Sequence, residues 1–307
     1  MATTSAAEGP FLRRSDQDAS GPLPNFLLIG AMKAGTTSMY HYLRAHPQVY
    51  MPTFKAPEFF AGKALSKRGV DWYRKQFAGV GPEAVAIGEA SNVYTKYPHY
   101  PGVPGRIAEL IPEARLLYIV RDPVARIRSH YQTRVVEGSE KLPLLEALTS
   151  NSIYLDYSRY AMQIEQYLEH FPREQLLVTT AEALRDDRDS VVRAVYAFLG
   201  VDPEIRPADL DREFYKSADK PARSLLPIGL KKTLKTRLPS TKRFKELETK
   251  IVRRLDKVRG RTEEDKALNP VTVVGDAERA TIVAALRDDV ARLRPYLDDG
   301  FDGWSIA

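Results

Sequence analysis

The 307-residue chain contains no cysteine, which excludes disulfides, thiolate metal sites and cysteine nucleophiles. It has only five histidines, and none of them forms an HExxH or HxH pattern, so no built-in metal centre is expected. No apolar run approaches the roughly 20 residues that span a bilayer. The chemistry of this chain must therefore come from oxygen atoms and cationic nitrogen atoms, and a cytoplasmic protein is the default expectation.

Charge is unevenly distributed along the chain. The segment 216–262 holds 16 lysine or arginine residues against 4 aspartate or glutamate residues, a net charge of +12 in a chain of net charge +6. Such a stripe can steer a polyanion, contact an anionic membrane surface, or simply be a solvated helical face. Residues 1–22 are small and polar and are expected to form a disordered leader. Residues 23–307 are expected to form one domain, which includes the basic segment.

Apolar runs rich in β-branched and aromatic residues alternate with stretches of helical periodicity. The predicted strands are 25–30, 84–90, 115–120 and 175–180, and the predicted helices include 38–46, 104–112, 123–137, 157–172 and 189–200. This alternation predicts an α/β fold, a P-loop-like three-layer sandwich whose mostly parallel central sheet is flanked by helices. Ligands of such sheets bind beyond the carboxyl ends of the strands, where the first loop, Glu89 and Arg121 fall.

The loop after the first predicted strand reads GAMKAGTTS and has the character of a phosphate cradle. Gly30 and Gly35 let backbone amides close around an anion at the start of the next helix, where the helix dipole favours negative charge. A nucleotide-binding P-loop of the GxxxxGK(S/T) type places lysine directly after the second glycine. Here Thr36 occupies that position, and Lys33 lies inside the loop.

This loop resembles the 5′-phosphosulfate-binding loop of the sulfotransferases that use 3′-phosphoadenosine 5′-phosphosulfate (PAPS), in particular bacterial and heparan-sulfate or carbohydrate members. The resemblance covers about residues 24–305. It implies that PAPS is the co-substrate, that 3′-phosphoadenosine 5′-phosphate is the product, and that Lys33 stabilises the leaving bridge oxygen. The donor-binding residues expected in this loop are Lys33, Ala34, Gly35, Thr36, Thr37 and Ser38.

A second anion site follows the third predicted strand. Arg121 stands at the strand end and Ser129 lies eight residues later, which resembles the family's 3′-phosphate-binding signature. A guanidinium fork suits a phosphate dianion. In the family a late loop adds an aromatic residue near the adenine and a Lys…Arg pair to the 3′-phosphate, and Tyr215, Lys220 and Arg223 match these positions, although KPAR stands where KGR is usual.

An alcohol acceptor must lose a proton during transfer, which calls for a general base. Carbohydrate-type relatives carry this base as a glutamate in KEPxFF, whereas this chain reads KAPEFF, with Ala56 in the usual glutamate position. Glu58 is two residues further, and in an extended segment it would point to the same side. Glu58 is therefore the leading candidate, with His130 and Glu89 as alternatives. Lys55 is expected to hold the transferring sulfate or an acidic acceptor.

Two other functions remain open on the sequence alone. A P-loop kinase or NTPase would use Asp122 as a metal-binding carboxylate, but the lysine placement and the missing GK(S/T) disfavour it. A membrane- or nucleic-acid-binding module would use the basic segment. The favoured prediction is a metal-independent sulfotransferase acting on a small-molecule, carbohydrate or glycolipid acceptor, with no nucleic-acid partner and with the basic segment contacting a membrane peripherally.

Overall fold

The computed structural model describes residues 21–62, 68–208, 210–211 and 273–307. The expectations for residues 1–20 of the leader, for the basic segment 216–262 and for Tyr215, Lys220 and Arg223 lie outside these residues.

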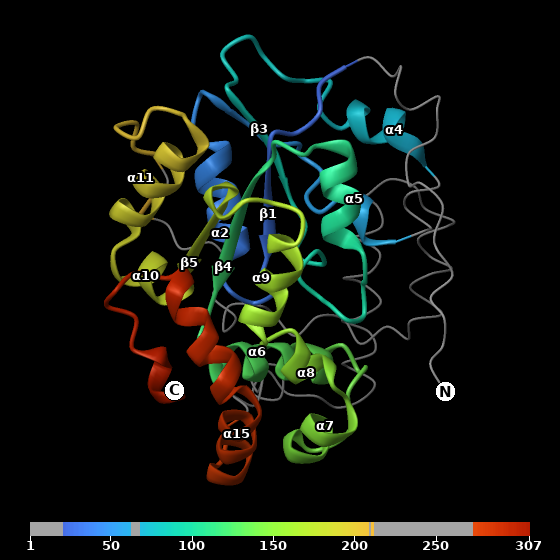
Figure 1. Ribbon diagram of the computed structural model, residues 1–307, viewed down its shortest axis with the longest axis vertical. Coiled ribbons are helices and arrows are strands. Elements are labelled where there is room, and N and C mark those ends of the chain that lie inside the picture. The colour runs from blue at the N-terminus through green and yellow to red at the C-terminus, as the bar shows by residue number, and fades with distance from the viewer. Residues whose placement is uncertain (1–20, 63–67, 209, 212–272) are drawn as a thin grey trace, which may run out of the picture.

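A parallel five-stranded sheet, ordered β2-β3-β1-β4-β5, forms the centre of the molecule (Figure 1). Its strands are β1 Phe26–Gly30, β2 Val49–Tyr50, β3 Ala86–Ala90, β4 Arg115–Val120 and β5 Leu176–Thr180. The four predicted strands are confirmed. The edge strand β2 is new, because two residues are too short to produce a periodic pattern.

The middle strands are apolar because both of their faces are covered. Every residue of β1 is buried, as are all residues of β4 after Arg115. Continuous apolar runs of this kind are typical of parallel sheets packed between two layers of helices.

Helices flank the sheet on both sides, as the three-layer prediction requires. Helices α2 (Thr36–Arg44) and α11 (Arg188–Leu199) pack together on one side, where the Tyr196 hydroxyl donates to the Tyr42 carbonyl at 2.8 Å. Helices α5 (Val103–Leu110) and α9 (Tyr160–Leu168) pack together on the other (Figure 1). The remaining α-helices are α4 Gly69–Lys75, α6 Pro123–Val136, α7 Leu144–Ser150, α8 Ile153–Asp156, α10 Ala181–Asp186 and α15 Asp276–Leu293, and the 3₁₀ helices are η1 Phe59–Ala61, η2 Arg173–Gln175, η4 Arg294–Tyr296 and η5 Gly303–Ser305.

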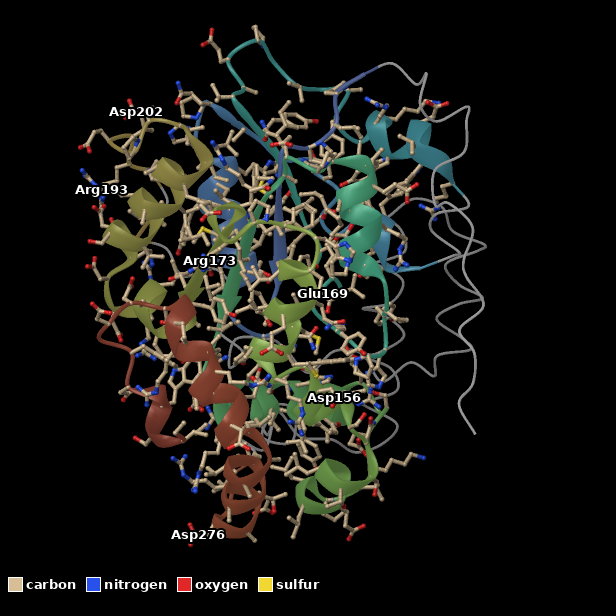
Figure 2. The ribbon with its side chains drawn as sticks, viewed as in Figure 1. Asp156, Glu169, Arg173, Arg193, Asp202 and Asp276 are labelled. Carbon is tan, nitrogen blue, oxygen red and sulfur yellow. The ribbon has the colours of Figure 1, made fainter. Side chains whose placement is uncertain are left out.

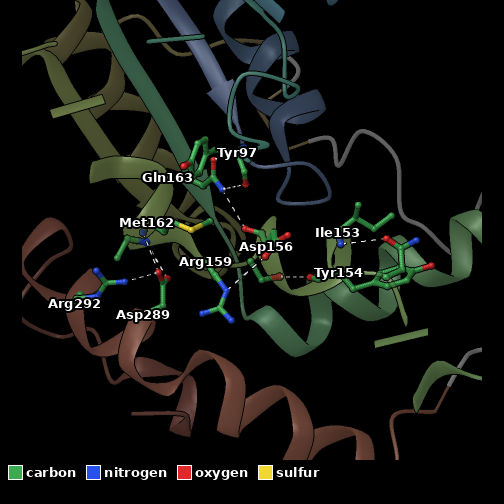
Figure 3. A network of polar contacts seen from close by, with 12 residues as sticks. Tyr97, Ile153, Tyr154, Asp156, Arg159, Met162, Gln163, Asp289 and Arg292 are labelled. Carbon is green, nitrogen blue, oxygen red and sulfur yellow. Dashed lines mark hydrogen bonds and ion pairs between the residues drawn. The ribbon is translucent and has the colours of Figure 1, made fainter. Parts of the chain in front are cut away.

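The C-terminal helix α15 packs against α6, α7, α8 and α9. Its Asp289, only 2% exposed, accepts hydrogen bonds from the backbone amides of Ala161 and Met162, both at 3.0 Å (Figure 3). These amides lie in the first turn of α9, where no intrahelical acceptor exists. The helix predicted over 157–172 therefore begins only at Tyr160, with a carboxylate from a distant segment as its N-terminal acceptor.

Several charged side chains are exposed on the surface of the molecule, among them Glu169 and Arg173 (Figure 2). Arg193, Asp202 and Asp276 are exposed at its periphery (Figure 2). Among the residues that the structure describes, no helix is both long enough and apolar enough to cross a membrane.

Candidate functional site

The expected site residues meet at the carboxyl edge of the sheet. The loop after β1, the end of β3 and the start of α6 after β4 all lie at this edge, because the three strands are parallel neighbours. In Figure 1 this is the lower end of the sheet, where α6 begins.

Two glycines shape the loop between β1 and α2. Gly35 has φ 90°, in the left-handed region, and immediately precedes the first residue of α2. A Cβ on Gly30 would lie 2.1 Å from the Thr95 hydroxyl, so no larger residue fits there. The helix has no side-chain cap, and the Ser38 amide already donates to the Gly35 carbonyl at 3.0 Å, so the amides of Thr36 and Thr37 are the ones that could bind an anion.

Lys33 joins this loop to helix α6. Its ammonium donates to the Thr133 hydroxyl at 2.7 Å, and that hydroxyl donates to the Ser129 carbonyl at 2.9 Å. Lys33 is itself in the left-handed region, with φ 73°. The structure thus brings Lys33 and Ser129 together through Thr133, a residue that the sequence interpretation missed. The signal was present, since Thr133 lies one helical turn after Ser129 and shares its face.

Arg121 is held beside the same loop. Its Nη1 donates to the carbonyl of Lys33 at 3.0 Å, and its own carbonyl accepts from the Tyr160 hydroxyl at 2.8 Å. The loop and the strand-end arginine therefore lie side by side, and each could bind an anion. Such a donor set of guanidinium, ammonium and helix amides fits a nucleotide that is anionic at both ends.

Asp122, the metal ligand of the kinase alternative, has a structural role. Its carboxylate accepts from the backbone amide of Val124 at 2.9 Å and caps α6. Within the described ranges, no group of three or more His, Cys, Asp or Glu side chains could hold a metal ion.

The KAPEFF segment is not extended, so the argument that placed Glu58 on the same side as position 56 is wrong. Ala56 and Glu58 have φ values of 61° and 54°, and η1 follows directly. Lys55 donates to the Thr37 hydroxyl at 2.7 Å and lies 5.5 Å from the Tyr40 ring centroid. The segment is consequently attached to the start of α2, beside the anion-binding loop.

Glu58 lies near the ammonium of Lys96 and the carboxylate of Glu89. Within the described part of the chain its partly exposed carboxylate has no hydrogen-bond or ion-pair partner. Burial lowers the pKa of Lys96, while the nearby Glu58 charge opposes that shift. An unengaged carboxylate beside the anion-binding loop has the freedom that a general base needs.

His130 is buried among aromatic side chains. It is 6% exposed, stacks on Tyr157 at 6.0 Å and tilts against Tyr154 at 4.9 Å. Burial lowers its pKa to about 2, and the charges of Arg126, Lys96, Arg134 and Lys33 act in the same direction. Because a base of such low pKa holds a proton weakly, His130 is a much poorer candidate than Glu58.

Glu89 is the third predicted base, and it lies at the buried end of β3. Only 1% exposed, it accepts from the Ser91 hydroxyl at 2.7 Å, the Tyr94 hydroxyl at 2.6 Å and the Tyr73 hydroxyl at 3.4 Å. Burial raises its pKa to about 7, although these three hydrogen bonds oppose the shift. A carboxylate fully occupied by protein donors cannot also reach an acceptor hydroxyl.

The sequence is similar to those of heparan sulfate sulfotransferases. It is 32% identical over 202 residues to the mouse bifunctional heparan sulfate N-deacetylase/N-sulfotransferase 4, covering 59% of this chain and 23% of that protein. It is 30% identical over 216 residues to the mouse heparan sulfate glucosamine 3-O-sulfotransferase 3A1, covering 66% of this chain and 51% of that one. The match thus spans about a quarter of the length of the first of these relatives and about half of the second.

A solved structure resembles this fold. The crystal structure of a sulfotransferase from Alicyclobacillus acidocaldarius is 29% identical, with a TM-score of 0.55, and the match covers 78% of this chain and 97% of that one. The sequence model of the family described as Sulfotransferase domain matches residues 23–233. With the anion-binding loop and Arg121 on adjacent strand ends, these findings establish that the chain belongs to the sulfotransferase-domain family.

Proposed function

We propose that this protein transfers a sulfuryl group from PAPS to a hydroxyl or amine of a carbohydrate acceptor. The observation that carries the proposal is the pairing of the Gly30–Gly35 loop with Arg121, joined by the hydrogen bond from Arg121 to the Lys33 carbonyl. This pairing would give the 5′-phosphosulfate one site and the 3′-phosphate a neighbouring one.

Different residues of the chain would bind the two ends of PAPS and stabilise the leaving group. The α2 amides and the hydroxyls of Thr36, Thr37 and Ser38 would hold the 5′ end, and Arg121 and Ser129 the 3′ end. PAPS supplies an activated sulfuryl group whose bridging S–O bond breaks as a new S–O or S–N bond forms to the acceptor. The Lys33 ammonium, which donates a hydrogen bond to the Thr133 hydroxyl in this structure, would stabilise the negative charge left on the bridging oxygen.

Glu58 would accept the proton that the acceptor loses. Its carboxylate lies in the segment that Lys55 attaches to α2, and it has no partner among the described residues. Its segment contacts the start of α2 through Lys55 and Thr37, which would bring a base close to the loop that carries Lys33.

The acceptor class rests on the relatives. Both of those named above modify heparan sulfate, one at nitrogen and one at oxygen. A glycan bearing free amines and hydroxyls is therefore the first acceptor to test. The earlier expectations of a cytoplasmic location and of peripheral membrane contact through residues 216–262 remain predictions.

The experiment combines donor binding with product identification. Calorimetry compares 3′-phosphoadenosine 5′-phosphate with AMP, and tighter binding of the former by at least about tenfold is expected from the additional Arg121 contact. The full-length protein is then incubated with sulfur-labelled PAPS and a panel of glycans, including de-N-sulfated heparan sulfate, and products are identified by mass. Equal affinity for the two nucleotides would refute the proposal.

Treatment with EDTA separates this function from the kinase alternative. Sulfuryl transfer through Lys33 and Glu58 should survive chelation, whereas a phosphoryl transferase would lose its Mg²⁺ and its activity.

A further inference from the structure

Glu89 is the centre of a buried hydrogen-bond network. Its carboxylate receives three hydroxyl donors from three positions: Ser91 just after β3, Tyr94 in the following loop, and Tyr73 on α4. Glu89, Ser91, Tyr73 and Tyr94 are each no more than 2% exposed. The network is therefore inaccessible to an acceptor, and its function must be exerted through other residues.

Each of the three donors also contacts the segment that carries Glu58. The Ser91 hydroxyl accepts the backbone N–H of Glu58 at 3.0 Å. The Tyr94 hydroxyl accepts the N–H of Phe60 at 3.5 Å. The Tyr73 ring stacks on Phe59 with centroids 4.3 Å apart and planes within 6° of parallel. One carboxylate thus organises contacts to three consecutive residues, 58, 59 and 60.

The held segment needs this support because its backbone is strained. Ala56 and Glu58 both have positive φ, a region that non-glycine residues enter at a cost and occupy only where surrounding contacts enforce it. The Ser91 hydroxyl binds the amide of Glu58 itself, the residue at one of these two positions. Its geometry is fixed in turn, because it donates to Glu89 while it accepts from Glu58.

We infer that Glu89 is a positioning residue, which acts through Ser91, Tyr94 and Tyr73 to hold the Glu58 carboxylate opposite the anion-binding loop. The inference rests on the proposed function, in which Glu58 is the base. It also offers a way for a glutamate two positions from the usual one to serve, because the network fixes a turn at Glu58, where φ is 54°.

The network predicts an order of effects among conservative variants. Ser91→Ala removes the direct contact to Glu58 and should lower kcat by roughly tenfold or more. Tyr94→Phe removes a contact two residues away and should lower kcat by a few fold. Tyr73→Phe keeps the stacking on Phe59 and removes only the longest hydrogen bond, so its effect should be smallest. For all three, the KM for PAPS and the affinity for 3′-phosphoadenosine 5′-phosphate should stay within about twofold, because the donor site is untouched.

The decisive measurement is a double-mutant cycle of Ser91→Ala with Glu58→Gln, using sulfur-labelled PAPS and the full-length protein. If Ser91 acts by positioning Glu58, its removal lowers kcat in the wild-type background and has almost no further effect when Glu58 is already glutamine. Equal losses in the two backgrounds would mean that Ser91 acts on general stability, and would overturn the inference.

Tyr196→Phe is the matched control for the tyrosine variants. Its buried hydroxyl donates to a backbone carbonyl between α11 and α2, away from the Glu58 segment, so its loss should lower the thermal midpoint without lowering kcat. A near-normal rate for Glu58→Gln would also overturn the inference, while labelled transfer by the wild-type protein would leave the proposed function standing.

Discussion

The two halves of the candidate site are built in different ways. The donor half depends on backbone geometry: Gly35 turns the chain into α2, and Arg121 and Lys33 meet because β1 and β4 are parallel neighbours. The acceptor half depends on buried side chains: the Glu89 network holds a segment that has no regular structure of its own before η1. A site of the first kind can be recognised from sequence motifs, whereas a site of the second kind can be recognised only once the three-dimensional structure is known.

The largest effect is expected at Lys33 in the donor half. Lys33→Ala should lower kcat by roughly 10²–10³, because it removes the cation that we propose stabilises the leaving oxygen, while nucleotide affinity should fall only modestly. Initial rates and calorimetry on the same protein samples separate the two quantities. Lys75→Ala, at an exposed lysine of α4, is the control and should match the wild type. A large loss of affinity with normal turnover would place Lys33 in binding alone.

Glu58→Gln tests the acceptor half alone. It should lower kcat by roughly 10², because glutamine has nearly the same shape but cannot accept the acceptor's proton. The nucleotide affinity should be unchanged, in contrast to a donor-site variant. Steady-state kinetics at saturating PAPS measures the effect, with Glu83→Gln at an exposed glutamate as the matched control. An unchanged rate would leave the acceptor half without a base.

Arg121→Ala tests the donor half alone. It should weaken the binding of 3′-phosphoadenosine 5′-phosphate by roughly tenfold or more, since a charge-assisted hydrogen bond to the 3′-phosphate is lost. Its binding of AMP should change little. Calorimetry with both nucleotides is the measurement, and Arg185→Ala, at a surface arginine that pairs with its neighbour Asp186, is the control. A similar loss of affinity for both nucleotides would show that Arg121 does not bind the 3′-phosphate.

Glu89 should also make the free energy of unfolding of the protein depend on pH. Burial raises the pKa of Glu89 from 4.5 to about 7, so the folded state binds a proton more tightly than the unfolded state. The resulting stabilisation is complete below pH 4.5 and is lost as the pH rises through 7, an effect of roughly 3 kcal/mol. The other titratable groups that face Glu89 are Glu58, Tyr73, Tyr94 and Tyr167, and the charge of Glu58 adds to the shift.

Urea denaturation at pH 5, 6, 7 and 8 measures this dependence. The free energy of unfolding of the wild type should fall relative to that of Glu89→Gln across this range, because glutamine does not titrate. Parallel curves for the two proteins would contradict the assignment of the shifted pKa to Glu89.

Much of the donor half could be predicted because its signals are local. Apolar runs gave β1, β3, β4 and β5, and glycine spacing gave the loop. The contact from Lys33 to Thr133 was not predicted, since it joins residues 100 positions apart, although Thr133 shares a helix face with Ser129.

The acceptor half could be predicted only in part. The sequence favours Glu58 as the candidate base, but through an extended geometry that its positive φ contradicts. Glu89 was interpreted as a base because a carboxylate at a strand end suggests chemistry, whereas its three hydroxyl donors come from residues that no motif connects. Backbone strain and buried networks are tertiary properties, and periodicity does not report them.

The bond between Asp289 and the start of α9 bears on where this protein can be shortened. The sequence match to the family ends at residue 233, yet Ile282, Leu286 and Val290 of α15 are fully buried. A polypeptide cut at the end of that match would leave the amides of Ala161 and Met162 without their acceptor and would expose an apolar surface. The smallest soluble fragment that retains this architecture should therefore include the final 32 residues, Asp276 to Ala307.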